Sequence, residues 1–191
     1  MDNRVLFNIG YGLYVLTAQE GNQDNGCIIN TVMQVTSDPC QIAIAVNKRN
    51  YTNQMIQNTK KFNISVLSEN AKFDTFKHFG FQSGRDVDKF AEMKLTELPS
   101  KNIKAPGIAE SPVNIECRVK KIMPLGSHDM FLAEVVGVTV DDKYMDEKGK
   151  FNLNRSGLIA YSHGEYFELG KKIGKFGYSV QKPGRKKKKR G

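Results

Sequence analysis

Two short polar segments carry side chains that are suited to binding a phosphate group. Residues 30–39 read NTVMQVTSDP and place amides and hydroxyls on what is otherwise an apolar strand. Residues 47–52 read NKRNYT and offer amides, cations and a threonine hydroxyl just before a predicted helix. Such groups beside a helix N-terminus are what a phosphate monoester requires. An exposed polar turn followed by a capped helix has the same composition, so the residues alone leave both interpretations open.

A histidine and a set of aromatic residues could face the ring of a ligand. His128 lies in GSHDMF (126–131), at the entrance to a predicted strand, and could donate a hydrogen bond to a ring or a phosphate. A lone histidine at a strand end equally fits a solvated surface position. The aromatic residues that could flank a flat ring, or belong to an ordinary core, are Tyr11, Tyr14, Phe79, Tyr161, Tyr166 and Phe167.

Several other kinds of chemistry are not encoded. The chain has no G-x-G-x-x-G opening a helix and no G-x-x-x-x-G-K-[ST], which argues against a Rossmann or P-loop nucleotide site. It has no G-x-S-x-G, and its 3 histidines lack carboxylates at metal-ligand spacing. The cysteines Cys27, Cys40 and Cys117 form no C-x-x-C pair. No metal site is therefore predicted, and a reducing cytoplasm is the expected compartment.

The elements that must position these residues are mostly strands, because apolar and polar residues alternate with period two. The predicted strands are 5–18, 26–36, 41–47, 61–68, 113–123, 130–140, 157–161 and 165–169. Polar residues 19–26 predict the first turn, and the apolar run at 41–47 predicts burial on both faces. A mainly β, antiparallel chain of roughly eight strands hides its edges by closing into a barrel. If the second and third strands are neighbours, the two polar segments converge at one end of that barrel.

Two or three short helices accompany the strands. Asn50 or Thr52 is the expected N-cap of the first helix. Phe73, Phe76 and Phe79 lie at i, i+3 and i+6, which predicts a second helix with a stripe facing the core. A short helical turn is expected within 81–92.

The positive charge of the chain is concentrated at its C-terminal end. Among 191 residues, Lys and Arg number 29 and Asp and Glu number 20, a formal net charge of +9. Residues 182–191, KPGRKKKKRG, hold seven of the basic groups and no acid, so the rest of the chain carries only +2. The longest apolar runs, such as 42–46, are too short to span a bilayer, and no signal segment is recognised. A nearly neutral body makes nucleic-acid binding an unfavoured interpretation.

Four segments in a fixed order resemble the flavin reductase-like family, whose members have an FMN-binding split barrel. They read FNIGYGLYVLTAQ, NGCIINTVMQVTSDPCQIAIAVNKRNYT, FGFQSGRDVDKF and GSHDMFLAEV. The likeness is strongest to flavoredoxins, ferric reductases and the flavin module of high molecular weight rubredoxins. It covers about residues 1–170, and residues 171–191 form a C-terminal extension with a basic tail.

The resemblance implies FMN as cofactor and NADH or NADPH as hydride donor. It implies that the backbone of Cys27–Thr31 holds the flavin ring and that Thr31, Gln34, Lys48, Asn50 and Thr52 are candidates for the phosphate. The full set of expected cofactor contacts is Tyr11, Cys27, Ile28, Ile29, Asn30, Thr31, Gln34, Asn47, Lys48, Arg49, Asn50, Thr52 and His128. It further implies an intertwined homodimer that passes electrons to free flavin, a ferric complex, rubredoxin or a flavodiiron protein.

The chain departs from the family pattern at three positions. Ile28 and Gln34 stand where many members have Ser or Thr, and Ala45 stands where ferric-reductase relatives have Cys. No thiol role is therefore expected at position 45, and Cys27 is expected to be buried and inert. Two alternatives stay open beside the NAD(P)H-dependent enzyme. One is a flavoredoxin-type electron carrier that does not use NAD(P)H, and the other is a nucleic-acid-binding barrel.

Overall fold

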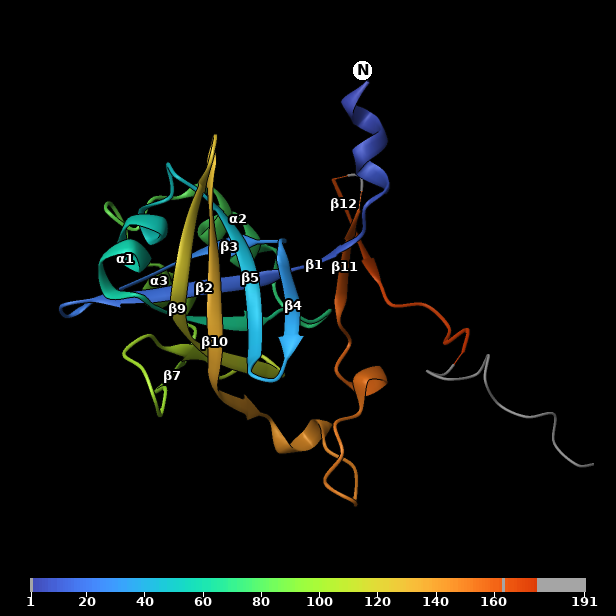
Figure 1. Ribbon diagram of the computed structural model, residues 1–191. Coiled ribbons are helices and arrows are strands. Elements are labelled where there is room, and N and C mark those ends of the chain that lie inside the picture. Colours follow the sequence, from blue (N-terminus) through green and yellow to red (C-terminus); the bar gives the residue numbers. More distant parts are fainter. Residues whose placement is uncertain (1, 163, 175–191) are drawn as a thin grey trace, which may run out of the picture.

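A computed structural model describes residues 2–162 and 164–174. Seven antiparallel strands form one curved sheet in the order β3-β2-β6-β9-β10-β5-β4, which makes the split barrel in Figure 1. The bounds are β2 Tyr14–Glu20, β3 Gln23–Ile29, β4 Val32–Ser37, β5 Cys40–Asn47, β6 Lys61–Val66, β9 Val113–Leu125 and β10 His128–Val140. The two edge strands, β3 and β4, follow one another in the chain and are joined only by residues 30 and 31.

Both ends of the described chain come together beside the barrel in a second small sheet. Its strands are β1 Tyr11–Gly12, β11 Ile159–Ser162 and β12 Glu165–Glu168, in the order β1-β11-β12. The 3-10 helix η1 Asn3–Asn8 precedes it, and η2 Asp142–Tyr144 and η3 Leu153–Arg155 lie on the connection from the barrel. Figure 1 shows this sheet and η1 standing away from the barrel; we call residues 2–12 and 159–169 the arm.

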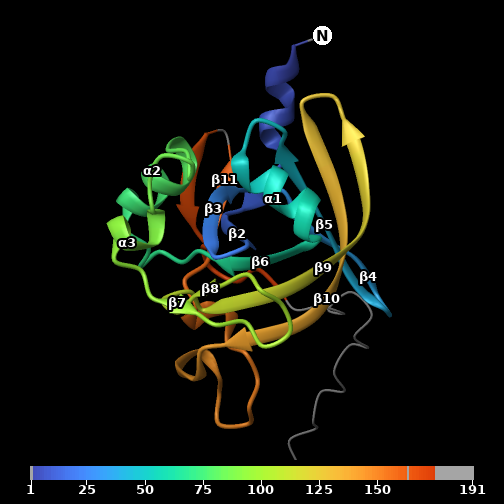
Figure 2. The ribbon, with the colours of Figure 1, turned by 90° about the vertical axis from the view of Figure 1, so that its left-hand side faces the viewer.

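Three helices and a small β ribbon complete the fold. α1 Tyr51–Thr59 contacts β2 and β3, whereas α2 Phe73–Phe81 and α3 Lys89–Met93 contact each other and β3. Figure 2 shows α1 against the barrel and the α2–α3 pair beside it. The ribbon consists of β7 Glu97–Leu98 and β8 Gly107–Ile108.

The alternation of apolar residues along β2 divides the interior into two cores. Leu16 and Ala18 point into the barrel, where Met55 and Ile56 of α1 join them. Leu13 and Val15, which are offset from these by an odd number of residues, face the core beneath α2 and α3. Successive side chains of a strand point to opposite faces, so period-two sequence produces this division directly.

A buried carboxylate holds α1 in place on the barrel. Asp129 of β10 is 4% exposed, and its Oδ2 accepts hydrogen bonds from Asn53 Nδ2 and Gln57 Nε2, both at 3.1 Å. Lys48 Nζ lies 3.8 Å from Asp129 Oδ1. Asn53 Nδ2 also donates to the Val46 carbonyl at 3.1 Å, so the helix is bonded to two neighbouring strands.

The predicted strands and barrel are confirmed, but several of the predicted boundaries are wrong. Residues 19–26 are not a long turn, because β2 and β3 continue to a two-residue turn at Gly21–Asn22, where Gly21 has a positive φ of 63°. The predicted strand 26–36 is two strands, β3 and β4, which leave opposite edges of the sheet. The predicted burial of 41–47 on both faces is confirmed by Ile42, Ala43 and Ile44.

Expectations for the remaining segments also have mixed outcomes. Helix α1 begins after Asn50, whose side chain makes no cap hydrogen bond, and Thr52 lies inside the helix. The first strand does not begin at residue 5, because residues 3–8 form η1. The helix predicted from the phenylalanine stripe is confirmed, with Phe76 and Phe79 buried. Among the described residues, no helix is both long and apolar enough to cross a membrane. The basic tail at 182–191 lies outside the described residues.

Replacing Asp129 by alanine is expected to lower the free energy of unfolding by about 2–4 kcal/mol, because the buried amide of Asn53 and the exposed amide of Gln57 both lose a charged acceptor. Glu134→Ala on the same strand is the matched control. Its carboxylate pairs with Lys120 at 3.2 Å on the surface, where a pair contributes about 1 kcal/mol or less. Urea unfolding of both variants measures the difference, and equal losses would contradict the role given to Asp129.

Candidate functional site

Two adjoining pockets lie at the end of the barrel where β5 passes into α1, and Asn50 lines both. The first, which we call the ring pocket, has a volume of about 250 Å³ and is lined by Leu13, Ile28, Ile29, Asn30, Ala45, Asn47, Asn50, His128, Tyr161 and Tyr166. The second, which we call the anion pocket, has a volume of about 190 Å³. Its lining is Asn25, Cys27, Arg49, Asn50, Tyr51, Thr52, Phe79, Gly80, Phe81, Gln82, Ser83, Gly84 and Lys89.

The turn between β5 and α1 positions the residues that the two pockets share. Asn47 Oδ1 accepts a hydrogen bond from the Arg49 amide at 2.9 Å, and its carbonyl accepts one from the Asn50 amide at 3.0 Å. The Lys48 amide donates to the Ser127 carbonyl at 3.0 Å, which fastens the turn to the start of β10. Asn47 and His128 are direct partners in the β5–β10 register, so the ends of both strands face one pocket.

The ring pocket combines aliphatic and aromatic side chains with several polar groups. Ile28 and Leu13 supply aliphatic surface, and Tyr161 and Tyr166 of the arm stand together with their ring centroids 5.5 Å apart. Asn30, Asn47 and His128 add hydrogen-bonding groups. His128 Nδ1 lies 2.8 Å from Ser127 Oγ, which fixes the orientation of the imidazole. Apolar walls with a few placed polar groups are typical of pockets that hold a ring system.

The anion pocket holds buried positive charge without a carboxylate beside it. Lys89 is 4% exposed, and its Nζ donates to the Gly26 carbonyl at 2.7 Å. Loss of hydration on burial lowers the pKa of the Lys89 ammonium. Within residues 2–162 and 164–174, neither Lys89 nor Arg49 forms a salt bridge. A buried cation without a counter-charge favours the binding of an anion.

Two buried side-chain oxygens in the same pocket also lack partners. Asn25 Oδ1 and Gln82 Oε1 accept no hydrogen bond from any described residue. Asn25 is held in place, because its Nδ2 donates to Thr52 Oγ1 at 3.0 Å. Gly84 lies so close that a Cβ there would collide with Asn25 Oδ1. Oxygens in this position can accept hydrogen bonds from the hydroxyl groups of a ligand.

Cys27 lines the anion pocket, but its thiol is expected to be unreactive. Burial raises the pKa of its thiol to about 11, and hydrogen bonding from Thr52 and the charge of Lys89 offset only part of that rise. The thiol is therefore almost entirely protonated at neutral pH, and the thiolate is the reactive form. The expectation of a buried thiol is confirmed.

The structure brings together most, but not all, of the predicted site residues. The ring pocket is lined by Ile28, Ile29, Asn30, Asn47, Asn50 and His128, and the anion pocket by Cys27, Arg49, Asn50 and Thr52. The residues that line neither pocket are Tyr11, Thr31, Gln34 and Lys48.

The four residues outside the pockets have other contacts in the described chain. Gln34 lies toward the far end of the β4–β5 hairpin, where its Nε2 donates to the Thr36 carbonyl at 3.3 Å. The two polar segments therefore converge only at Asn30 and Thr31. Thr31 lies at the same end of the barrel as the two pockets, and its carbonyl accepts a hydrogen bond from the Ala45 amide at 3.4 Å. Tyr11 pairs with Tyr161 in the arm, and the ammonium of Lys48 lies against Asp129.

Several pocket residues were not predicted as site residues. Lys89, Ser83 and Gly84 come from the segment FGFQSGRDVDKF, and Asn25 comes from the stretch expected to be a turn. One sequence pattern could have indicated Lys89. It directly follows Asp88, the N-cap residue of α3, and it lies five residues after the Ser83-Gly84 pair. Tyr161 and Tyr166 were considered as ring-flanking residues, and both line the ring pocket.

The fold is that of a flavoprotein oxidoreductase with a split barrel. Residues 6–170 match the model of the flavin reductase like domain, and the chain belongs to the flavin reductase-like family of enzymes. The expected resemblance is thereby confirmed. The family match includes every residue that lines the ring pocket and the anion pocket.

Individual relatives agree with this assignment. The chain is 38% identical over 143 residues to a high molecular weight rubredoxin of Moorella thermoacetica, covering 73% of this chain and 60% of that protein. It is 31% identical over 170 residues to the ferric-chelate reductase (NAD(P)H) of Archaeoglobus fulgidus, covering 88% of this chain and 99% of the relative. The flavoredoxin of Desulfovibrio vulgaris (Miyazaki F) has a similar fold, with a TM-score of 0.82 at 24% identity over 90% of this chain and 93% of that one.

The burial of two of the three cysteines predicts a clear order of reactivity. Cys40 is exposed, whereas burial raises the thiol pKa of both Cys27 and Cys117. In the folded protein at pH 8, iodoacetamide is expected to modify Cys40 at least about 100-fold faster than the other two. Peptide mass spectrometry over time measures the three rates, and unfolding in urea should make them similar. Fast labelling of Cys27 in the folded state would contradict the stated environment.

Proposed function

We propose that the protein binds FMN, with the isoalloxazine in the ring pocket and the phosphate in the anion pocket. The observation that carries the proposal is the adjacency of the two pockets through Asn50. One pocket has aliphatic and aromatic side chains together with polar groups, and the other holds Arg49 and the buried Lys89 without carboxylate partners among the described residues. FMN has its parts in the matching order, with a ring joined by a polar ribityl chain to a phosphate.

The residues of the chain would divide the binding among themselves. Arg49, Lys89 and the Thr52 hydroxyl offer charge and hydrogen bonds to a phosphate. Asn25 Oδ1 and Gln82 Oε1 offer acceptors to the ribityl hydroxyls. Asn30, Asn47 and His128 surround the ring edge, while Tyr161 and Tyr166 cover the pocket and limit access of water. The phosphate role expected for Asn50 and Thr52 stays a prediction, as do those of Thr31, Gln34 and Lys48.

When bound, FMN supplies hydride and single-electron chemistry, and the protein supplies placement and electrostatics. We propose that NADH or NADPH is the hydride donor, because relatives include a ferric-chelate reductase named for NAD(P)H and an NADPH-flavin oxidoreductase of Streptomyces viridifaciens. No nucleotide motif is required of the chain, since a donor can stack directly on an exposed ring.

The electron acceptor belongs to one of a few classes. The relatives that carry rubredoxin or diflavin flavoprotein names favour a redox protein of the rubredoxin or flavodiiron type. A ferric complex or free flavin is the alternative favoured by the ferric-chelate reductase. A flavoredoxin-type carrier that receives electrons from another protein would need the same two pockets, so only a kinetic measurement separates it from the NAD(P)H-dependent enzyme. The cytoplasm stays the expected compartment.

We also propose that the active species is a homodimer. The described chain exposes an unusual number of large apolar side chains on the arm and on β4, namely Val5, Leu6, Phe7, Ile9, Met33, Val35 and Phe167. Exposed apolar surface of this kind is typical of a protein interface. Because Tyr161 and Tyr166 of the arm also line the ring pocket, a partner that covers the arm would fix one wall of the flavin site.

The purified protein is expected to be a yellow dimer. Flavin absorbance should appear near 370 and 450 nm, roughly as for any bound flavin. Anaerobic NADH or NADPH should bleach it, and light scattering should give about twice 21.5 kDa. Failure to take up FMN on reconstitution would overturn the proposal. Flavin that is reduced by a reduced rubredoxin or ferredoxin, but not by pyridine nucleotide, would support the carrier instead.

Removing the positive charge from the anion pocket is expected to weaken FMN more than riboflavin. Arg49→Gln and Lys89→Met should each lower FMN affinity by about 10-fold or more, since a charge-assisted hydrogen bond contributes about 1.5–3 kcal/mol. Riboflavin, which has no phosphate, should change by less than about twofold. Quenching of flavin fluorescence measures both affinities. Arg118→Gln, at an exposed position outside both pockets, is the matched control. Equal losses of affinity for FMN and riboflavin would show that the phosphate binds outside the anion pocket.

A further inference from the structure

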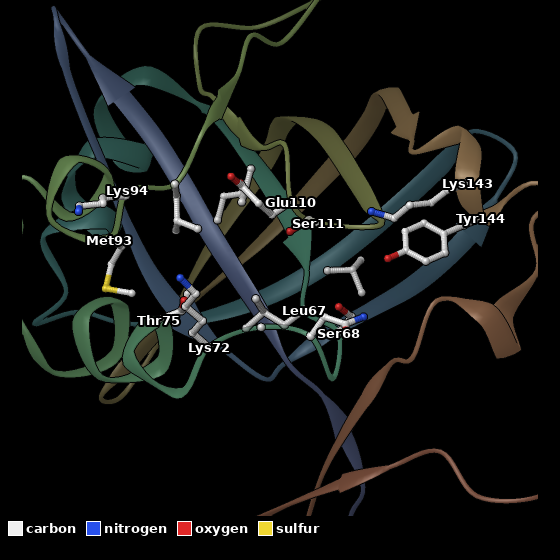
Figure 3. A pocket seen from close by; sticks show the side chains of 15 residues that line it. Leu67, Ser68, Lys72, Thr75, Met93, Lys94, Glu110, Ser111, Lys143 and Tyr144 are labelled. Carbon is white, nitrogen blue, oxygen red and sulfur yellow. The ribbon is translucent and has the colours of Figure 1, made fainter.

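A separate pocket of about 410 Å³ lies behind the flavin site. It opens between the end of β6, the start of α2, the end of α3 and η2, as Figure 3 shows. The Leu67 amide donates to the Leu13 carbonyl at 3.1 Å; Leu67 lines this pocket and Leu13 lines the ring pocket. Neighbouring segments of the chain therefore line the two pockets. Nothing in the proposed flavin chemistry uses this second pocket, which we call the rear pocket.

The interior of the rear pocket is apolar. Leu67 and Ile108 are 4% and 2% exposed and belong to the core beneath α2 and α3. Met93 and Leu95 extend this surface from the end of α3. The volume is within the range of roughly 300–1,000 Å³ that is usual for small-molecule sites. The pocket can therefore hold the apolar body of a small ligand.

Three residues in the wall carry hydroxyl groups that form no side-chain hydrogen bond with another described residue. Ser68, Thr75 and Ser111 are 4%, 4% and 5% exposed, and all three line the pocket. No side-chain hydrogen bond joins any of their hydroxyls to another described residue. Because none of the three oxygens is among the enclosed side-chain atoms that lack a partner, each stays open to the pocket. Hydroxyls that meet only the pocket are suited to hydrogen-bonding a polar group placed inside it.

The mouth of the pocket is positively charged. Lys72, Lys94 and Lys143 line it, and Figure 3 labels all three side chains. Lys143 is paired with Asp141 at 2.7 Å, whereas Lys72 and Lys94 form no salt bridge with a described residue. Glu110 is the acidic residue in the lining. Its carboxylate accepts from the Thr96 amide at 3.0 and 3.3 Å, which disperses part of its charge.

The N-terminus of α2 adds to this positive field. The helix has nine residues and starts at the pocket, where Lys72 is its N-cap residue and makes no side-chain cap hydrogen bond. Amide groups of a first helical turn carry partial positive charge and bind anions. Asp74 lies in the same turn but does not line the pocket.

We propose that the rear pocket is a second ligand site, which binds a small organic anion with an apolar body. The body would rest on Leu67, Met93 and Ile108, and the anionic group would receive hydrogen bonds from the hydroxyls that line the pocket and charge from Lys72 and the start of α2. Carboxylates with a short hydrocarbon chain or ring have this chemistry. The site does not depend on flavin, because its residues are separate from those of the ring and anion pockets.

The test uses octanoate as the probe, with octanol and octylammonium as probes of equal length and different charge. Each is titrated into the ¹⁵N-labelled, FMN-saturated protein and followed by amide chemical shifts. Octanoate is expected to shift the amides of Ser68, Thr75 and Ser111, and to bind at least about threefold more tightly than octanol and octylammonium. The protein as purified without added FMN should give the same shifts, which keeps this result distinct from the proposed flavin function.

Two variants test the named groups, and one serves as control. Lys72→Gln and the nearly isosteric Thr75→Val should each weaken octanoate by about threefold or more, with an otherwise unchanged amide spectrum that shows a folded protein. Lys77→Gln, an exposed lysine on the same helix outside the pocket, should change the affinity by less than about 1.5-fold. The proposal is overturned if octanol binds as tightly as octanoate, if the shifts fall on the arm or the ring pocket, or if Lys72→Gln and Lys77→Gln behave alike.

Discussion

The position of the whole functional end depends on the buried carboxylate of Asp129. It binds two amides of α1 and lies against Lys48, so one side chain of β10 fixes the helix and the turn that precedes it. That turn contributes Asn47 to the ring pocket, Arg49 to the anion pocket and Asn50 to both. A buried carboxylate is stable only when fully partnered, and this requirement allows α1 one position on the barrel. The contacts of Asp129, which lies outside both pockets, therefore set the position of the residues that line them.

The split of the barrel has a chemical consequence. β3 and β4 are consecutive strands on opposite sheet edges, so the chain at Asn30 and Thr31 leaves the sheet where β5 ends. Backbone groups there are free of ladder pairing on one side and can meet a ligand. On the other side stand two tyrosines of the arm. The ring pocket thus has one wall from the barrel sheet and one wall from a small separate sheet, whose Tyr161 and Tyr166 pack on the core beneath α2.

The sequence predicts the strands well because period two survives wherever one face is buried, as along β2. It fails at residues 19–26, since Gln23, Asp24 and Asn25 have turn-like composition but pair with β2. Asn25 is tolerated in a buried strand because its amide bonds to Thr52, 27 residues away. The anion pocket was incompletely predicted for the same reason. Lys89 reaches the Gly26 carbonyl across 63 residues, and no local pattern reports that the lysine is buried.

The anion pocket and the rear pocket offer charge in different ways. In the first, the cation itself is buried, and the lowered pKa of Lys89 shows the cost of removing its hydration. A bound anion would relieve that cost, so its affinity should depend strongly on net charge. In the rear pocket the lysines stay hydrated at the mouth, and the hydroxyl-bearing residues of the wall carry no charge. Exposed charges are screened by salt and attract weakly, which leaves apolar contact as the larger contribution. The first pocket therefore suits a phosphate, and the second suits a singly charged, mainly apolar molecule.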